Sequence, residues 1–483
     1  MSRSLVIVGD TLLDRDVDGT VQRLCPDAPA PVLDERTSTD RPGGAGLAAL
    51  FAAADGSDVT LVTALADDPA AARLTELLAV AGIRVRALPM AGATGEKIRL
   101  RADGQTLLRL DRGAAADVGE PTETMLEALS EADAILVSDY GRGVARQPTL
   151  RHALAQAAAP VVWDPHPRGP AAVPGTRLLT PNEAELHRLT RSAPGGARLS
   201  VVAAGARLLR DRWRAGAVAV TMGADGALLC HSGAAPLVIP AAGGDDRVPD
   251  TCGAGDRFAA AATVALAGGA LVSEAVQKAV ACASAYVADG GAAGITRTRP
   301  PATGVSVPTH AGPGTAGAGT DRRGAAAVIS RVRAAGGTVV ATGGCFDLLH
   351  AGHVATLRAA RRLGDCLIVC LNSDRSVASL KGPDRPLIPQ QDRAALLAAL
   401  TCVDAVVIFD ERTPETVLPW LRPDIWVKGG DYTGDGSADL PEADLVRQWG
   451  GQTVLVPYLD GRSTTGTIAV ARAGGGRATE GRR

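Results

Sequence analysis

The stretch TVVATGGCFDLLHAGHVATLRAARRLG, residues 338–364, decides the fold of the C-terminal part of this chain. Its apolar opening predicts a buried β-strand, and residues 345–350 predict a turn. The spacing of Val354, Leu357 and Leu363 then predicts a helix. A strand followed by a turn and a helix is typical of parallel sheets whose faces are covered by helices.

Two of the seven histidines of the chain, His350 and His353, lie at the start of this predicted helix. Free backbone N–H groups and the helix dipole favour an anion there, and Gly352 leaves space for it. The spacing lets both imidazoles face one phosphate and stabilise charge on an attacked α-phosphate. A structural pair of core histidines is the alternative. A metal site fits less well, because no third ligand stands at a recognisable spacing.

The same alternation of apolar runs and helical patterns extends through the chain and predicts an α/β fold. The predicted strands include residues 4–10, 58–65, 134–141, 160–165, 177–182, 217–223, 337–344, 365–374, 404–410 and 424–431. Ligands of such folds bind at the carboxyl ends of the strands, where most motifs of this chain fall.

A length of 483 residues is too great for one ordinary core. Residues 298–324, rich in Pro, Gly, Thr and Ala, predict a flexible linker, and residues 473–483 predict a disordered tail. The predicted domains are therefore 1–297 and 325–472.

A net charge of -2 gives no reason to expect binding to nucleic acid or membranes, and no apolar run approaches a membrane span. The N-terminal apolar run is too short for a signal peptide and predicts a first strand. The eight scattered cysteines form no metal-ligand pattern, so we expect a reduced, cytoplasmic protein without a metal site of its own.

In the second domain, the HAGH motif is followed in order by LNSDRSV, KGPDRPL, VKGGDY and GRSTTGTI. This series resembles the HxGH signature of cytidylyltransferase-like nucleotidyltransferases and implies a smaller, Rossmann-like domain. The resemblance implies that the triphosphate of ATP is held by Thr342, Gly343, Lys381, Lys428, Ser463, Thr464 and Thr465, together with the histidines. It implies that Asp347 positions the nucleotide or Mg²⁺ in the substrate site.

In the first domain, the strongest stretch is VPDTCGAGDRFAAAATVAL, residues 248–266. Gly253, Ala254 and Gly255 open a predicted helix whose first N–H groups form an anion cradle, and Asp256 stands in its first turn. Phosphoryl transfer to a hydroxyl needs a cradle and a base, which predicts that Asp256 is this base. A plain helix cap is the alternative for this aspartate.

Residues 97–113, KIRLRADGQTLLRLDRG, predict a β-hairpin with one basic face. Lys97, Arg99 and Arg109 on that face suit a lid that binds an already phosphorylated sugar. A solvated surface is the alternative.

These motifs together resemble the ribokinase-like (PfkB-type) carbohydrate kinases. The resemblance implies sugar contacts from Asp10 and Asp14, at the end of the first strand, and close substrate approach at Gly43 and Gly44. It implies an ATP site formed by Asn182, Glu183, Ala184, Glu185, Thr221, Gly223 and Gly226, with the N-x-x-E residues associated with Mg²⁺. Turns and a helix cap are the structural alternatives. Leu47 departs from the family, which usually has Asn there.

A kinase of this type followed by an HxGH transferase resembles the bifunctional heptose 7-phosphate kinase and heptose 1-phosphate adenylyltransferase family. The resemblance implies heptose phosphates and ATP as substrates, Mg²⁺ with ATP, ADP-heptose as product, and a homodimer through the kinase domain. Another phosphosugar kinase fused to a cytidylyl- or adenylyltransferase is the alternative. A regulatory protein with degenerate sites is disfavoured by Asp256, His350 and His353.

Overall fold

The computed structural model describes residues 2–103, 105–113, 117–191, 197–231, 233, 235–241, 251–291, 321–430 and 441–457. The chain forms two compact units. The first consists mainly of residues before 292, and the second mainly of residues after 320. The short segments 193–204 and 228–240 group with the second unit.

The first unit is built on a parallel sheet with the strand order β5-β4-β1-β8-β9-β10-β11. The strands are β1 (Ser4–Gly9), β4 (Asp58–Leu65), β5 (Arg84–Pro89), β8 (Ala134–Ser138), β9 (Val161–Asp164), β10 (Leu178–Leu179) and β11 (Val218–Thr221). All five residues of β8 are buried, as expected for a strand covered on both faces. The strand order reverses at β1, and ligands of such sheets bind at the carboxyl ends of the strands beside such a reversal.

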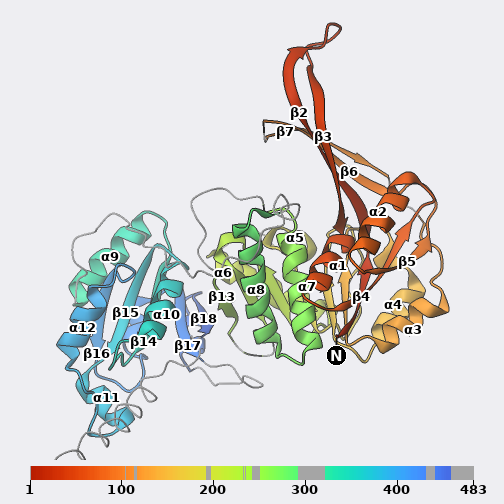
Figure 1. Cartoon of the computed structure of the whole chain (residues 1–483). Coiled ribbons are helices and arrows are strands. Elements are labelled where there is room, and N and C mark those ends of the chain that lie inside the picture. The colour runs from red at the N-terminus through yellow and green to blue at the C-terminus, as the bar shows by residue number, and fades with distance from the viewer. Residues whose placement is uncertain are drawn as a thin grey trace, which may run out of the picture. The chain divides into compact units, whose positions relative to one another are not determined.

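Helices cover this sheet (Figure 1). Those before residue 192 are α1 (Ala45–Ala54), α2 (Pro69–Val80), α3 (Glu123–Glu131), α4 (Pro148–Gln156) and α5 (Glu183–Thr190). Then come α6 (Arg198–Trp213), α7 (Ala254–Ala267) and α8 (Val272–Ala288). The short strands β12 (Ala227–Cys230) and β13 (Leu237–Ile239) fall almost entirely in the segment 228–240, which groups with the second unit. Helix α7 packs against α1, α8, β8 and β9. Its small buried side chains, Ala259 to Ala262, permit this close approach.

A separate four-stranded sheet, here called the lid, projects from the first unit in the order β3-β2-β6-β7 (Figure 1). Its strands are β2 (Thr11–Leu24), β3 (Pro31–Gly44), β6 (Gly95–Ala102) and β7 (Gln105–Arg112). The antiparallel β6–β7 pair confirms the predicted hairpin. The sequence analysis missed β2 and β3, because their many charged residues obscure the apolar alternation that identifies strands. Asp14 therefore lies inside β2, not at the end of the first strand as predicted.

The second unit contains a parallel sheet with the order β16-β15-β14-β17-β18, which confirms the Rossmann-like prediction. The strands are β14 (Val339–Gly344), β15 (Cys366–Asn372), β16 (Ala405–Phe409), β17 (Ile425–Gly430) and β18 (Gln452–Pro457). The helices are α9 (Arg322–Ala334), α10 (Ala351–Arg361), α11 (Asp374–Lys381), α12 (Gln390–Ala398), α13 (Val417–Leu421) and α14 (Pro441–Arg447). The order in which strands are added to the sheet reverses at β14, and the two histidines follow this strand in the chain.

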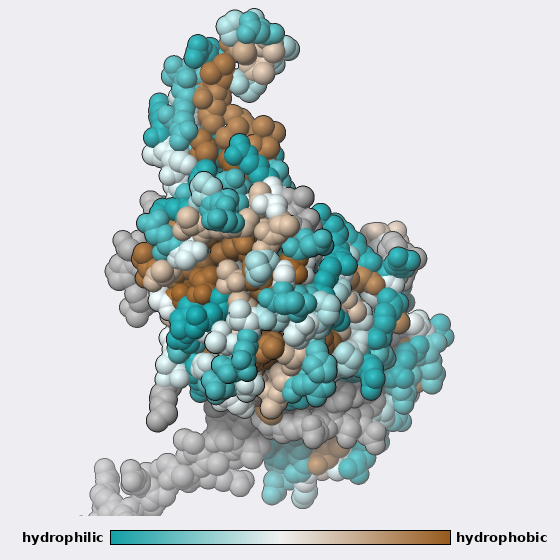
Figure 2. Space-filling model, turned by 90° about the vertical axis from the view of Figure 1, so that its right-hand side faces the viewer, coloured by the Kyte–Doolittle hydropathy of each residue, from teal (hydrophilic) through white to brown (hydrophobic). Residues whose placement is uncertain are grey.

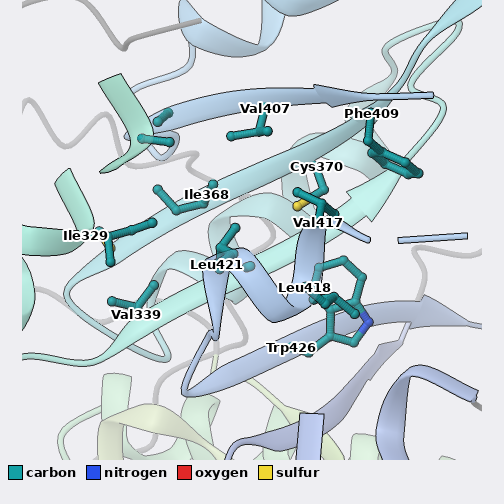
Figure 3. Close-up of a cluster of buried hydrophobic side chains, with 14 of the residues drawn as sticks. Ile329, Val339, Ile368, Cys370, Val407, Phe409, Val417, Leu418, Leu421 and Trp426 are labelled. Atoms are coloured by element: carbon teal, nitrogen blue, oxygen red, sulfur yellow. The ribbon is translucent and has the colours of Figure 1, made fainter. Parts of the chain in front are cut away.

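The core of the second unit lies between the sheet and its helices (Figure 3). Ile368, Val407 and Trp426 from three strands pack there against Leu418 and Leu421 of α13. Such a continuous apolar core accounts for the near-continuous apolar strands of the sequence.

Helix α9 begins earlier than predicted. The side chain of Asp321 caps it by accepting a hydrogen bond from the N–H of Gly324 at 2.7 Å. Residues 322–324, which the sequence analysis assigned to the linker, are thus its first turn. The predicted tail 473–483 and the rest of the linker lie outside the described residues. Among the described helices, none is long and apolar enough to cross a membrane.

Candidate functional sites

The first candidate site lies at the start of α7. Gly253 precedes the helix with a φ of 83°, a conformation that favours glycine, and a Cβ on Gly255 would meet no described atom within 4 Å. Space is therefore left beside Gly255 in the first turn of α7, and the anion cradle there stays a prediction. Asp256 follows in this turn and is only 6 % exposed.

Asp256 accepts a hydrogen bond from the hydroxyl of Tyr140, which lies 2.8 Å from Oδ1 and 2.9 Å from Oδ2. Burial raises the pKa of Asp256 to about 7, against the opposing effects of the Tyr140 hydrogen bond and the positive charge of Lys97. A buried carboxylate with a pKa near neutrality suits a general base. The sequence analysis did not identify Tyr140, because it belongs to no phosphate-binding motif.

Asp10 follows β1 at the reversal of the strand order, but it does not point freely at a substrate. Its carboxylate accepts three backbone hydrogen bonds, from Tyr140, Arg142 and Val144, at 2.9 to 3.1 Å. Asp10 thus organises the loop after β8, and its contact with sugar hydroxyls stays a prediction.

The paired glycines make room for side chains of the protein itself. A Cβ on Gly43 would lie 2.8 Å from Oδ2 of Asp14, and one on Gly44 would lie 3.3 Å from the ring of Tyr140. Gly44 also has a φ of 61°. Packing therefore requires glycine at both positions, and the close approach of the substrate there stays a prediction.

Asp14 is buried on β2, and its Oδ1 has no hydrogen-bond partner among the described atoms. The cations nearest to it are Lys97, at 3.9 Å, and Arg99, at 3.6 Å. An unsatisfied carboxylate oxygen beside two cations suits a sugar hydroxyl that donates to it. Asp14 thus remains the stronger of the two predicted sugar ligands.

The basic face of the lid is partly neutralised. Arg99 lies 3.3 Å from Asp16, whereas Arg109, directly opposite Arg99 across the strand pair, binds Asp111 through two hydrogen bonds of 2.7 Å. Arg99 is mostly buried, and Arg109 is half exposed. Lys97 and Arg99 are therefore better placed than Arg109 to meet an anion at the base of the lid.

The N-x-x-E residues form a capping box at the start of α5. Asn182 accepts from the N–H of Glu185, and Glu185 accepts from the N–H of Asn182, both at 2.9 Å. Glu183 and Ala184 form the first turn of α5. Nearby, Thr221 ends β11, and positive φ values at Gly223 and Gly226 shape the following turn.

Asp164, at the end of β9, was missed by the sequence analysis. It accepts a hydrogen bond from Thr180 at 2.8 Å. Burial, together with the negative charges of Glu185 and Asp256, raises its pKa well above the usual range. The carboxylates of Asp164, Glu185 and Asp256 thus lie close enough to influence one another. They come from separate elements, so only the fold brings them together.

The second candidate site is a cavity of about 160 Å³ at the carboxyl end of β14. Its lining contains Thr342, Gly343, Gly344, Cys345, Phe346, Asp347, His353, Thr356, Lys381 and Gly429. The predicted residues Thr342, Gly343, His353 and Lys381 thus meet at one cavity. A Cβ on Gly343 would lie 2.8 Å from the ring of Trp426, and one on Gly344 would lie 3.1 Å from that of Phe346, so both glycines make room for aromatic side chains of the protein.

The two histidines stack at the start of α10, with ring centroids 3.9 Å apart. His350 is the N-cap residue and His353 stands in the first turn, where the helix dipole favours an anion. Burial, together with the positive charges of His350 and Lys381, lowers the pKa of His353 to about 4. His353 is therefore neutral near pH 7, and the phosphate groups of a nucleotide would favour its protonated form.

Two of the predicted residues of this site are bound within the protein. Asp347 is buried, forms an ion pair with Arg385 and accepts a hydrogen bond from the N–H of Leu387 at 2.6 Å, so the pKa of Asp347 is lowered. It holds the loop 385–388 and also lines the cavity, so its role in positioning the nucleotide or Mg²⁺ stays a prediction. Lys428 binds Glu442 at 2.8 Å. Ser463, Thr464 and Thr465 lie outside the described residues.

Within the described residues, no group of three or more His, Cys, Asp or Glu side chains could hold a metal ion. The carboxylates near α7 and the cations near α10 instead suit phosphate chemistry. The fold and sites define a carbohydrate kinase joined to a nucleotidyltransferase.

Comparison with known proteins agrees with this class. The pfkB family carbohydrate kinases match residues 2–299, and the cytidylyltransferase-like family matches residues 341–454. "Bifunctional protein HldE" of Streptomyces coelicolor is 54 % identical over 97 % of both chains, and that of Halorhodospira halophila is 39 % identical over 98 % of both. This chain belongs to the bifunctional HldE family. A solved Arabidopsis thaliana ribokinase with ribose and ATP has a TM-score of 0.46 and 23 % identity, over 59 % of this chain and 93 % of that one.

Proposed function

We propose that this bifunctional enzyme makes ADP-heptose in two separate steps. The first unit phosphorylates O1 of D-glycero-β-D-manno-heptose 7-phosphate with ATP. The second unit joins D-glycero-β-D-manno-heptose 1-phosphate to AMP from ATP and releases pyrophosphate. A phosphatase must act between the two steps, because the kinase product carries two phosphates.

The neighbourhood of Asp256 and Lys97 carries the kinase proposal. The base stands on α7, and the lysine reaches it from the lid strand β6. A sugar held between them places one hydroxyl at the carboxylate and leaves its distal phosphate near Lys97 and Arg99. The carboxylate accepts the proton of O1 as the oxygen attacks the γ-phosphorus, and the first turn of α7 stabilises the transferred group.

Mg²⁺ with ATP fits the first site. Glu185 and Asp256 give Asp164 a negative neighbourhood that a cation would neutralise, and carboxylate oxygens are ligands that Mg²⁺ prefers. Because Mg²⁺ keeps several waters and binds phosphates directly, two carboxylates suffice. Bound there, Mg²⁺ would offset the charge of the β- and γ-phosphates.

In the second site, His353 and Lys381 bind the phosphates of ATP, and Thr342 and Gly343 form the rear of the cavity. The attacking group is the phosphate of the sugar, which needs no base at neutral pH. The work of the site is therefore to stabilise charge on the α-phosphorus while pyrophosphate leaves.

We also propose cytoplasmic location and a homodimer formed through the lid. The lid exposes Leu107, Leu108 and Leu110 on its edge strand β7, and Figure 2 shows apolar side chains along it. Exposed apolar side chains on an edge strand favour pairing with a second copy. Sedimentation of the wild type against Leu108→Lys tests this. We likewise propose the domain bounds 1–297 and 325–472, with α9 extending the second domain back to Arg322.

The decisive experiment is product analysis by mass spectrometry. The purified enzyme with heptose 7-phosphate, ATP and Mg²⁺ should give only the bisphosphate, and an added phosphatase should allow ADP-heptose to form. Fructose and ribose phosphates serve as competing substrates. Faster turnover of either one would favour the alternative phosphosugar kinase.

A further inference from the structure

The reaction proposed above gives no role to Tyr140, although its hydroxyl group contacts the carboxylate of Asp256. Its hydroxyl lies within 2.9 Å of both carboxylate oxygens of Asp256, although the two residues are 116 positions apart in the chain. Tyr140 begins the loop after β8, whereas Asp256 stands on α7. The contact therefore depends on the packing of α7 against β8.

The loop that carries Tyr140 is fixed by buried carboxylates. Asp10 accepts from the N–H of Tyr140 itself and from those of Arg142 and Val144. Asp139 accepts from the N–H of Gly141 at 2.8 Å. The backbone N–H groups of residues 140, 141, 142 and 144 are thus all bound, so the phenol ring of Tyr140 has little freedom to move.

The ring of Tyr140 is also confined. A Cβ on Gly44 would lie 3.3 Å from two of its carbon atoms, so any larger residue at position 44 would press on the ring. The ring therefore packs against the backbone of residue 44, and its hydroxyl is directed at Asp256. Such double support is typical of groups whose position matters for a reaction.

Several charged or titratable groups face Asp256 from other elements. Lys97 of β6 favours its ionised form, whereas Asp14 of β2, Glu185 of α5 and Asp164 of β9 oppose it. Burial opposes the ionised form most strongly. Tyr140 supplies the one hydrogen bond to this carboxylate recorded among the described residues.

We infer that Tyr140 is a positioning residue of the kinase reaction, which orients the carboxylate of Asp256 and keeps it ready to accept the proton of the sugar hydroxyl. The inference rests on the proposed function of Asp256 as the base. In the reaction, the O–H bond of the sugar breaks, its oxygen forms the new bond to phosphorus, and ADP leaves. The proton passes to Asp256, and Tyr140 keeps its own proton throughout.

The test is the pH profile of kinase kcat/KM for Tyr140→Phe in the full chain. Without the hydrogen bond, the acid limb should move to higher pH by about 0.5 to 1 unit. The rate at pH 7 should fall by about 3- to 30-fold and recover partly at pH 9. Tyr286→Phe is the matched control. Its hydroxyl donates to the carbonyl of Cys252 at 2.8 Å, beside the same helix start but away from Asp256, so its acid limb should not move.

A second variant tests the direction of the effect. Replacing Tyr140 by 3-fluorotyrosine makes the phenol a stronger donor, which should move the acid limb to lower pH. An unmoved acid limb in both variants, or an equal shift in Tyr286→Phe, would overturn the inference. ATP binding to the kinase unit and the transferase activity report folding of each variant.

Failure of the proposed function gives a different result. If the wild type does not turn over heptose 7-phosphate, the substrate is wrong, and the profiles are compared with the sugar phosphate that it accepts. If Asp256→Asn keeps normal kinase activity, the base is wrong, and the inference falls with it.

Discussion

The imidazole rings of His350 and His353 stack with their planes inclined by 28° and their centroids 3.9 Å apart. Burial, together with the positive charge of His350, lowers the pKa of His353. Negative phosphate groups beside the ring would instead favour the protonated form of His353. The pair is therefore suited to bind a triphosphate without carrying a large positive charge beforehand.

The first prediction concerns stability at acid pH. Because the folded-state pKa of His353 is about 4, below its unfolded value, the unfolded state binds more protons between these values. The neutral His353 side chain therefore contributes fully to the stability of the folded state above about pH 6.5, and this contribution is lost as the pH falls toward 4. After discounting for solvent screening, His353→Gln should reduce the loss between pH 7 and pH 5 by roughly 1 kcal/mol. Calorimetric melting at both pH values measures this; an unchanged pH dependence would contradict it.

The second prediction is that the two reactions are separately lost. His350→Ala should lower adenylyl transfer by about 100-fold or more and leave the kinase rate unchanged, whereas Asp256→Asn should do the reverse. Coupled assays of ADP and pyrophosphate release distinguish the two. Loss of both activities in either variant would show that the sites are coupled.

The third prediction follows from the raised pKa of Asp256, about 7 in the folded state. The folded state binds more protons than the unfolded state between about pH 4 and pH 7, so stability from this group is lost as the pH rises through 7. Asp256→Asn should therefore stabilise the protein at pH 8, by about 1–3 kcal/mol, with little effect at pH 4. Denaturant titration of the wild type and the variant at both pH values measures the difference in free energy of unfolding. Equal effects at the two pH values would mean that the carboxylate is not held in this way.

The fourth prediction ranks the cations of the lid. Arg99→Ala should weaken the phosphosugar by about 1–3 kcal/mol, because Arg99 is mostly buried beside Asp14 and Asp16. Arg109→Ala should cost less, since Asp111 already neutralises this exposed arginine. ATP binding serves as the control for folding. A larger loss for Arg109 would place the distal phosphate further out on the lid.

The fifth prediction compares two glycines with positive φ. A Cβ on Gly44 would lie 2.5 Å from the carbonyl oxygen of Asp10, whereas one on Gly56 would meet nothing within 4 Å. Both alanine variants carry backbone strain of about 1 kcal/mol, but only Gly44→Ala must also displace the backbone and Tyr140. Gly44→Ala should therefore lower both the melting temperature and the kinase rate more than Gly56→Ala does. Equal losses would show that packing at residue 44 is unimportant.

The sequence by itself determined the classes of the two units. The helix starts that contain Asp256 and His353 are local motifs, in which a few successive residues define a turn, an anion site and a reactive side chain. The β6–β7 hairpin was likewise predictable, because alternation and a turn are local properties. Family membership then followed from the order of such motifs.

Only the tertiary structure showed which of the predicted ligands are held by contacts within the protein. Asp10 and Asp347 were read as ligands, yet each binds backbone amides of a loop distant in sequence. Tyr140 was not read at all, because its meeting with Asp256 requires a strand end and a helix start to pack together. A hydrogen bond depends on distances of a few tenths of an ångström, which residue types and their spacing along the chain do not specify across 116 positions.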